Sequence, residues 1–413
     1  MKFIFTVICL NLTLFAAAQR CGTPQYAKQN SLNSFVPSTA TTNDSLSRDT
    51  LPNEVIVVPV VIHVLYHSSG QNISDQQVMS QLTVLNNDYR RHNADTINTP
   101  QPFKNIAADA RIVFCLAKVD PNGHATSGII HKYTSSDLFL ADDEMKFSSS
   151  GGDDGWDSKK YLNIWVCNLF GRTLGYAVMP GGPAEKDGVV IQYTAFGTLG
   201  TVVAPFNKGR TATHEIGHWL GLKHLWGDAE CGDDGIADTP PQEAGNSGCA
   251  SFPHLSSCSI NAYGDMFMDF MDFTDDACMN MFTQGQKSEM RSLFALGNPR
   301  NSFLNSSVCD SSFAQGGPLP GDSSIISDKL TVSIYPNPFS NQITISAKTE
   351  SEISGKTAKL YDIIGKLFLT RIITTQTTSI NVTNLPSGMY FLKVEGGNTL
   401  KVFKLIKQNN GGL

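Results

Sequence analysis

The sequence predicts an α/β domain followed by a small all-β sandwich. Up to residue 309, β-branched runs alternate with helical patterns, as expected of strands and helices that share a core. Between residues 310 and 329 the composition shifts to Ser, Gly, Pro and Asp, which is typical of a linker. About seven short apolar and polar alternations, divided by Asn, Gly and Pro, occupy residues 330–413 and indicate the β-sandwich.

Length and charge limit what the chain can be. Its 413 residues suffice for two or three domains, and 41% hydrophobic with 16% charged residues suits a soluble globular protein. The formal net charge of -6 leaves no basic surplus, so nucleic acid is not an expected partner.

The N-terminus has the pattern of an export signal, residues 1–18. Lys2 precedes the apolar run 3–15, and cleavage is expected after Ala18. Because the run is too short to span a bilayer comfortably, we expect no transmembrane segment in the mature protein. We therefore expect the protein to be secreted or held at the cell surface. Residues 19–53, rich in Ser, Thr and Asn, are predicted to be a pro-segment.

Regular elements are expected throughout residues 54–309. Ser74 begins a capping-box pattern, and apolar residues at helical spacing follow it. Another helix is predicted at 284–296. Strands are predicted at 55–66, 111–119, 161–168, 174–178 and 188–193. One of the last two is expected at the sheet edge above a cleft, where an extended peptide would pair with it.

Three histidines in one short stretch have the spacing of metal ligands. His214 and His218 are four residues apart, so on a helix both imidazoles point the same way. Gly221 can leave the helix with positive φ, which turns the chain so that His224 reaches the same metal. Three protein ligands on one zinc ion leave a position for water, as in a catalytic site. An amphipathic structural helix would explain the apolar neighbours but not the histidines.

Glu215 lies beside the predicted water position. A carboxylate there can take a proton from the attacking water and pass it to the leaving amine. The stretch therefore predicts a hydrolase with a metal-activated water and Glu215 as general base.

The loop beyond the third histidine is acidic and irregular. We predict a structural calcium ion there, because a long irregular loop at an active site needs something to hold it. A merely solvated acidic loop is the alternative. The candidate oxygen ligands are Asp233, Asp234, Asp238 and Thr239.

Export makes the cysteines informative, because disulfides persist outside the cytosol. Cys115 and Cys167 lie in strand-like runs and are either bonded or buried thiols, with the buried thiol slightly favoured. Cys309 has no evident partner. Four more cysteines crowd into the irregular segment, where three pairings are open: Cys231, Cys249, Cys258 and Cys278.

Cys21 stands beside Arg20 in the predicted pro-segment, an arrangement that resembles the cysteine switch of matrix metalloprotease pro-segments. A thiolate is a good zinc ligand and would displace the catalytic water, which keeps a zymogen inactive. The alternative is an unpaired cysteine near a cleavage site. Both interpretations stay open.

Residues 214–224 resemble the long zinc signature of the metzincins, and their surroundings are similar to the pappalysin family with its secreted prokaryotic members. The similar segments lie within residues 217–227, 231–240 and 271–283, and the resemblance covers 55–308. It implies a metzincin-type α/β fold with a mixed sheet and an active-site helix. It also implies a zinc-dependent endopeptidase that acts on proteins or peptides.

The resemblance implies roles for residues near the site. Met271, chosen over the similar Met268 by its distance from the next cysteine, would form the methionine turn beneath the zinc. Phe273 replaces a tyrosine whose hydroxyl usually helps to stabilise the tetrahedral intermediate, which lowers the expected rate. Asp275 or Asp276 would form an acidic pocket for a basic residue after the scissile bond.

The resemblance also implies the disulfide pairs Cys231–Cys258 and Cys249–Cys278, and calcium near the acidic loop. Residues 330–413 resemble the sorting domain of Bacteroidetes type IX secretion, through residues 335–339, 385–391 and 401–405 among others. The expected partner of this domain is the secretion machinery.

Together these features predict a secreted zinc endopeptidase made as a latent precursor. Two alternatives remain: a surface binding protein that keeps the zinc fold with weak activity, or a zinc amidase for a small substrate.

Overall fold

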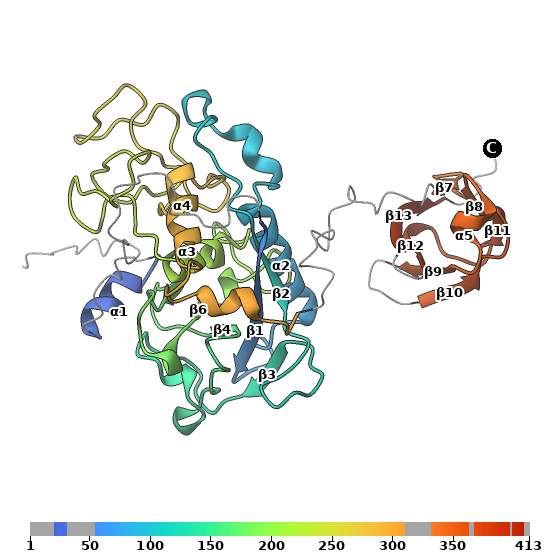
Figure 1. Cartoon of the computed structure of the whole chain (residues 1–413), viewed down its shortest axis with the longest axis horizontal. Coiled ribbons are helices and arrows are strands. Elements are labelled where there is room, and N and C mark those ends of the chain that lie inside the picture. The colour runs from blue at the N-terminus through green and yellow to red at the C-terminus, as the bar shows by residue number, and fades with distance from the viewer. Residues whose placement is uncertain (1–19, 31–53, 310–331, 363–366, 397–398, 409–413) are drawn as a thin grey trace, which may run out of the picture. The chain divides into compact units, whose positions relative to one another are not determined.

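The computed structural model describes residues 20–30, 54–309, 332–362, 367–396 and 399–408. Contacts divide the chain into two units, Met1–Gly316 and Gly317–Leu413 (Figure 1). The predicted signal peptide, the predicted linker and residues 31–53 of the predicted pro-segment lie outside the described residues.

A six-stranded mixed sheet is the framework of the first unit. Its strands are β1 (Ile56–Tyr66), β2 (Ile112–Leu116), β3 (Ile129–Tyr133), β4 (Leu162–Cys167), β5 (Gly175–Ala177) and β6 (Val189–Gln192). The central strand β1 pairs in parallel with β2 along its first half, with β3 along its second half and with β4 on its other side. Strand β6 continues the parallel array, and β5 is the antiparallel edge strand.

The strand predictions for this unit are confirmed, with ends that differ by a few residues, and β3 is the strand that sequence reasoning missed. Its middle residues, His131 and Lys132, are polar, and none of its five positions is fully buried. A strand with so little buried apolar surface carries a weak periodic signal.

Two helices pack against each other beside the sheet, α2 (Asp75–Tyr89) and α3 (Arg210–Trp219) (Figure 1). Ser74 caps α2, since its hydroxyl oxygen accepts from the backbone N–H of Gln77 at 3.3 Å. The Gln77 side chain does not complete the predicted capping box, because its amide donates to the carbonyl of Phe196 at 2.9 Å instead.

The predicted helix at 284–296 is shorter in the structure, where α4 spans Gln284–Ser292. It begins with a full capping box between Thr283 and Gln286. The helix ends at Ser292. The carbonyl of Ser292 accepts a hydrogen bond from the Asn298 side chain at 2.7 Å. Short 3-10 helices complete the unit: η1 (Ala94–Asn98), η2 (Gln101–Phe103), η3 (Glu144–Lys146), η4 (Ser148–Ser150), η5 (Ala184–Lys186), η6 (Tyr193–Ala195) and η7 (Asn301–Asn305).

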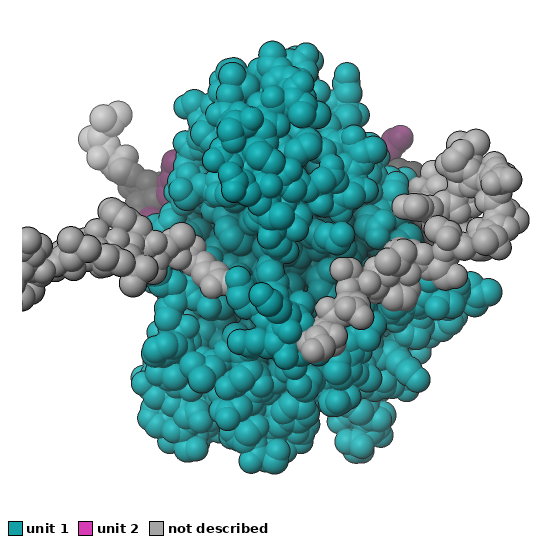
Figure 2. Space-filling model, turned by 90° about the vertical axis from the view of Figure 1, so that its left-hand side faces the viewer, with its two compact units in different colours: residues 1–316 teal, residues 317–413 magenta. Residues whose placement is uncertain are grey.

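The predicted pro-segment, residues 19–53, is called the leader below. Its described residues form one helix, α1 (Thr23–Gln29), which the sequence did not predict. It begins with Pro24 in its first turn and packs against β5. Figure 2 draws the described residues of the first unit as a teal space-filling surface.

The second unit consists of two antiparallel sheets with orders β10-β9-β12-β13 and β11-β8-β7. Buried aliphatic residues such as Ile343, Leu360 and Leu392 form its core. The seven strands predicted for this region are present, with the small helix α5 (Glu350–Ile353) between them. The strands are β7 (Val332–Tyr335), β8 (Gln342–Ala347), β9 (Thr357–Asp362), β10 (Leu367–Ile372), β11 (Thr377–Asn381), β12 (Gly388–Gly396) and β13 (Thr399–Lys407).

Among the described residues of the first unit, three disulfides form cross-links. Cys231–Cys258 and Cys249–Cys278 are the pairs that the family resemblance implied. The preference for a buried thiol at Cys115 is wrong, because Cys115 bonds Cys309 across 194 residues of sequence. The chain after η7 returns to β2, so spacing alone could not reveal this pair. Cys167 is a buried thiol, as predicted.

None of the helices among the described residues is both long and apolar enough to cross a membrane.

Candidate active site

Helix α3 places two of the three candidate ligands. His214 and His218 lie one helical turn apart and are both buried. The helix stops at Trp219, and Gly221 follows with a φ of 87°. This left-handed conformation favours glycine and turns the chain, so that His224 returns toward the helix.

The three imidazoles converge on one point. The Nε2 atom of His214 lies 3.1 Å from that of His218 and 3.2 Å from that of His224, and the latter two are 3.1 Å apart. The structure therefore brings together the three residues that the sequence predicted as zinc ligands.

The opposite nitrogen of each ring has an acceptor. Nδ1 of His214 lies 2.7 Å from the Phe270 carbonyl, Nδ1 of His218 2.8 Å from the Leu222 carbonyl, and Nδ1 of His224 2.5 Å from Asp228 Oδ1. These contacts favour a proton on Nδ1 and a lone pair on Nε2.

Three lone pairs cannot satisfy one another at these distances, but one cation can accept all three. Burial together with the neighbouring imidazoles holds the pKa of His214 well below its ordinary value and lowers the pKa of His218 to about 3. His214 and His218 are therefore neutral ligands, and a donor set of three imidazole nitrogens fits zinc.

Glu215 lies next to this cluster, under the leader. Its Oε2 accepts from the Thr23 hydroxyl at 2.8 Å, while its Oε1 is buried without a partner among the described residues. Burial raises the pKa of Glu215 to about 7, against the opposing effects of Thr23, Cys21 and Arg20.

Cys21 joins the histidine cluster. Its sulfur and the ligand nitrogens of the three histidines all lie within 4.8 Å of one another. Its Sγ also lies 3.4 Å from Glu215 Oε2, and Cys21 pairs in parallel with Gly175 of the edge strand β5. The predicted edge strand, β5, thus lies above the site, and the leader pairs with this strand.

Met271 is buried beneath the helix. A Cβ added to Gly217 would lie 2.5 Å from the Met271 sulfur, which places this methionine directly against α3. The neighbouring Phe270 carbonyl is the acceptor for His214. This position agrees with the Met-turn expected at Met271.

Phe273 packs against the ligands, with its ring centroid 4.7 Å from that of His224 and 5.7 Å from that of His214. Asp275 and Asp276 were the two candidates for an acidic specificity pocket, and of these Asp276 contacts the leader. Asp276 is fully buried, and its Oδ1 lies 2.8 Å from a terminal nitrogen of Arg20. Asp275 is half-buried and donates its backbone N–H to the Gly248 carbonyl.

The four predicted calcium ligands divide into two groups. Asp234 and Thr239 are in contact, since the Thr239 hydroxyl donates to Asp234 Oδ1 at 2.7 Å. Asp234 Oδ2 is buried without a partner among the described residues, and burial raises the pKa of this carboxyl to about 6. Asp238 instead accepts from Thr283 and Gly285 at the start of α4, and Asp233 is exposed.

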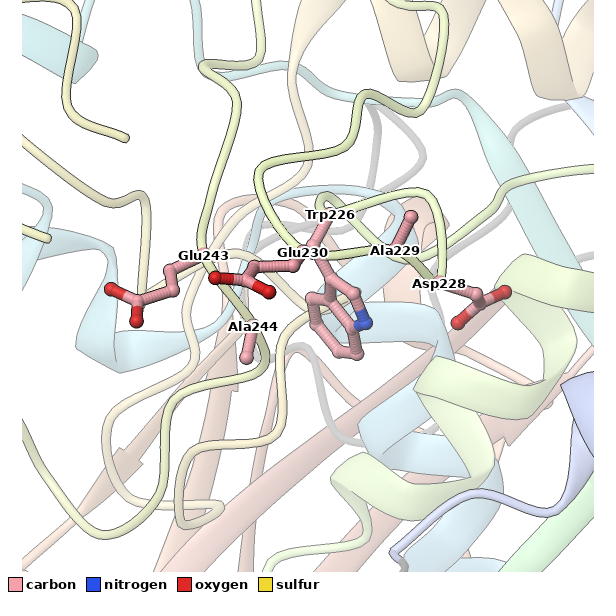
Figure 3. A pocket seen from close by; sticks show the side chains of 6 residues that line it. All are labelled: Trp226, Asp228, Ala229, Glu230, Glu243 and Ala244. Atoms are coloured by element: carbon pink, nitrogen blue, oxygen red, sulfur yellow. The ribbon is translucent and has the colours of Figure 1, made fainter. Parts of the chain in front are cut away.

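A pocket of about 390 Å³ opens beside the third histidine (Figure 3). The indole of Trp226 stacks on His224 with centroids 4.5 Å apart, and Asp228 holds the Nδ1 of the same ring. Trp226 and Asp228 in the pocket wall therefore also orient the imidazole of His224. The three carboxylates that line the pocket make the pocket acidic. The lining residues are Trp226, Asp228, Ala229, Glu230, Glu243 and Ala244.

Sequence reasoning missed three contacts of the site. Two of them are the hydrogen bond from Thr23 to Glu215 and the ion pair between Arg20 and Asp276. Both depend on the path of the leader across the first unit, which no local sequence pattern encodes. Asp228 follows His224 by four residues, a spacing that would have suggested contact only on a helix.

A histidine triad with an adjacent carboxylate, on a helix below the edge strand of a mixed sheet, defines a metalloendopeptidase. The family described as Pregnancy-associated plasma protein-A matches residues 148–295, and the Secretion system C-terminal sorting domain matches residues 333–408. Extracellular metalloprotease 1 of Coccidioides posadasii is 30% identical over 255 residues, which cover 58% of this chain and 77% of that protein.

Solved structures give the same result. Mature mirolysin of Tannerella forsythia in complex with a cleaved peptide is 50% identical, with a TM-score of 0.60, over 61% of this chain and 96% of that one. A promirolysin mutant from the same organism is 48% identical, with a TM-score of 0.61, over 66% of this chain and 90% of that one. The chain belongs to the pappalysin family, and it is a secreted metalloendopeptidase with a type IX sorting domain.

Proposed function

We propose that this chain is the latent precursor of a zinc endopeptidase in which Glu215 is the general base. The convergence of three buried Nε2 atoms at 3.1–3.2 Å beside a buried carboxylate carries this proposal. The alternatives, a weak surface binding protein and a small-molecule amidase, lack an observation that favours them over the peptidase of this family.

The proposed reaction uses few groups. His214, His218 and His224 would hold the zinc, which when bound supplies a Lewis acid and makes water nucleophilic at neutral pH. Glu215 takes the proton of the attacking water and returns it to the leaving amine. A carboxylate at this position can accept a proton and later donate it.

Latency would come from the leader, residues 19–53. Arg20, Cys21 and Thr23 contact Asp276, the histidine cluster and Glu215 respectively, so one short segment covers the whole site. These contacts support the cysteine switch over an unpaired cysteine near a cleavage site. Mature enzyme would form when this segment is released.

We predict that Cys21→Ala makes the precursor prematurely active. Weakening the leader by about 1.4 kcal/mol raises its open fraction about tenfold, and loss of the thiol removes at least one contact of this size. Hydrolysis of a quenched peptide by uncleaved precursor measures the effect, with Gln25→Ala at an exposed position of α1 as the control. Unchanged latency of Cys21→Ala would reject the switch.

Calcium would hold the loop around Asp234 and Thr239. The buried, unpartnered Asp234 Oδ2 supports a cation there, since carboxylate and hydroxyl oxygens are the ligands that calcium prefers.

We predict that removing calcium at constant zinc lowers the melting temperature of the first unit. A ligand at one hundred times its Kd contributes about 2.7 kcal/mol, which corresponds to about 5–10 °C in a unit of this size. Calorimetry with a calcium-selective chelator measures the shift, and Asp234→Asn should abolish the response to added calcium. An unaltered melting temperature of the wild-type chain would contradict the calcium assignment.

We predict that Phe273→Tyr raises the rate. The substituted ring would lie against His214 and His224 and carry a hydroxyl that can donate to a developing oxyanion, which we expect to increase kcat/KM about tenfold or more. Peptide hydrolysis by leader-free enzyme measures the gain, and Phe252→Tyr is a control on a loop elsewhere. A Phe273→Tyr variant with the same or a lower rate would show that this position does not limit catalysis.

Specificity would come from Asp276. In the precursor the Arg20 guanidinium binds Asp276, donates to the Thr274 carbonyl and lies over the Phe206 ring with 4.9 Å to its centroid. Because Arg20 is adjacent to Cys21 at the histidine cluster, a substrate with arginine next to its scissile bond can place that side chain in the same pocket. We assign this position to the residue after the scissile bond.

Export would use both ends of the chain. Residues 1–18 would direct it to the periplasm, and residues 330–413 would engage the type IX machinery through the sorting domain that the comparison identifies.

A further inference from the structure

A second apolar cluster of the first unit includes one residue of the leader. Tyr26 on α1 is 1% exposed, and its ring centroid lies 4.9 Å from that of Tyr176 on β5. The other described members of this cluster come from residues 65–190, which remain when the leader is gone. Release of the leader therefore opens a cavity of the size of a tyrosine side chain.

The cavity has polar groups matched to a phenol. The Tyr26 hydroxyl donates to Asp143 Oδ2 at 2.7 Å. The buried Lys146 ammonium lies 5.2 Å from the Tyr26 ring centroid and 4.9 Å from that of Tyr176, within the range of a cation–π contact. An aromatic ring with a hydroxyl thus satisfies each group that faces it.

The groups that face Tyr26 also contact one another. Asp143 Oδ1 lies 2.7 Å from Lys146 Nζ, and Asp143 Oδ2 lies 3.1 Å from Lys186 Nζ. Lys146 also donates to the Lys186 carbonyl at 2.9 Å, and the Tyr176 hydroxyl donates to Asp143 Oδ1 at 3.2 Å. Because none of these contacts involves the leader, we expect the pocket to keep its acceptor and its cation when Tyr26 leaves.

The pocket lies along the path of a bound peptide. Tyr176 belongs to β5, whose neighbouring Gly175 pairs with Cys21 and whose backbone passes over Glu215. The leader runs from Asp276, through the histidine cluster, to this pocket within seven residues, Arg20 to Tyr26. If Asp276 binds the residue after the scissile bond, the Tyr26 pocket lies on the opposite side, upstream of the bond.

We propose that the pocket vacated by Tyr26 is a substrate subsite that selects an aromatic residue, tyrosine above phenylalanine, upstream of the scissile bond. Tyr26 is its occupant in the precursor, so the leader blocks specificity sites on both sides of the histidine cluster. Tyrosine is preferred because phenylalanine would remove the phenol donor of Asp143 Oδ2 and leave this oxygen with Lys186 as its remaining partner among the described residues. The inference rests on the proposed function for the direction of the substrate.

A peptide library tests the subsite on the full chain after an added protease has released the leader. Every peptide keeps arginine after the scissile bond, and each upstream position in turn carries Tyr, Phe, Leu, Ala or Asp. We expect one position at which Tyr exceeds Ala in kcat/KM about tenfold or more, and at which Tyr also exceeds Phe. Absence of any upstream aromatic preference overturns the subsite, whereas absence of cleavage altogether refutes the proposed peptidase.

Asp143→Asn tests the acceptor. Asp143 has a φ of 74°, a conformation that Asn adopts as readily as Asp, so the exchange suits the backbone. We expect it to reduce the ratio of Tyr to Phe cleavage, with Asp137→Asn as a control outside the cluster. An unchanged ratio in a folded variant overturns the assignment.

A second measurement does not depend on folding of that variant. Synthetic peptides of residues 20–30, with Tyr26 kept or replaced by Phe or Ala, are assayed as inhibitors of the leader-free enzyme. We expect the inhibition constant to rise in the order Tyr, Phe, Ala, by about tenfold or more overall. Equal inhibition by the Tyr and Ala peptides overturns the pocket.

Discussion

Glu215→Ala is expected to lower kcat/KM for peptide hydrolysis by about 10³-fold. The three histidines still present their Nε2 atoms to one point, because none of their Nδ1 acceptors involves Glu215. What is lost is the carboxylate that takes a proton from water and returns it to the amine. The measurement is hydrolysis of a quenched peptide after an added protease has released the leader from both proteins.

Two controls separate this role from a structural one. Zinc content and melting temperature of Glu215→Ala should match those of the parent chain, and Glu215→Gln, which keeps the shape but cannot accept a proton, should be equally slow. Comparable, negligible cleavage by parent and variant would instead support the weakly active binding protein. Full activity of Glu215→Gln would remove the general base from the proposal.

The sequence predicted the triad well because local geometry determines it. Helical periodicity places His214 and His218 on one face, and Gly221 is the residue that adopts the left-handed turn toward His224. The structure adds the orientation of each ring, which depends on the Phe270 and Leu222 carbonyls and could not be read from spacing.

Contacts between distant segments escaped prediction. The Cys115–Cys309 disulfide and the Arg20–Asp276 ion pair each join residues that no periodic pattern relates. The choice between Asp275 and Asp276 was open for the same reason, since neighbouring residues on an irregular loop can face opposite directions. The path of the leader across the edge strand favours Asp276, because it brings Arg20 to that carboxylate.

Asp276→Asn is expected to lower kcat/KM about 10²-fold for substrates with arginine after the scissile bond. Asp276 is fully buried, and its Oδ1 pairs with the guanidinium of Arg20 in the precursor. An amide of the same shape would leave a buried arginine without its counter-ion, which costs more than the loss of an exposed pair. The measurement compares matched peptides that carry Arg, Lys, citrulline or Ala at this position.

Asp276 also has a structural role, so the experiment must distinguish loss of arginine selectivity from general destabilisation of the protein. Its Oδ2 also accepts from the backbone N–H groups of Lys208 and Arg210 at the start of α3, so misfolding would slow every peptide equally. Loss of the charge alone should slow the Arg peptide and spare the citrulline peptide, which keeps the shape of arginine without its charge. Asp275→Asn is the neighbouring control, because Asp275 makes no contact with Arg20 among those the structure gives and should leave the ratio of Arg to citrulline cleavage unchanged. If that ratio stays the same in Asp276→Asn, the acidic pocket does not select arginine, and the Arg20 contact serves only to hold the leader.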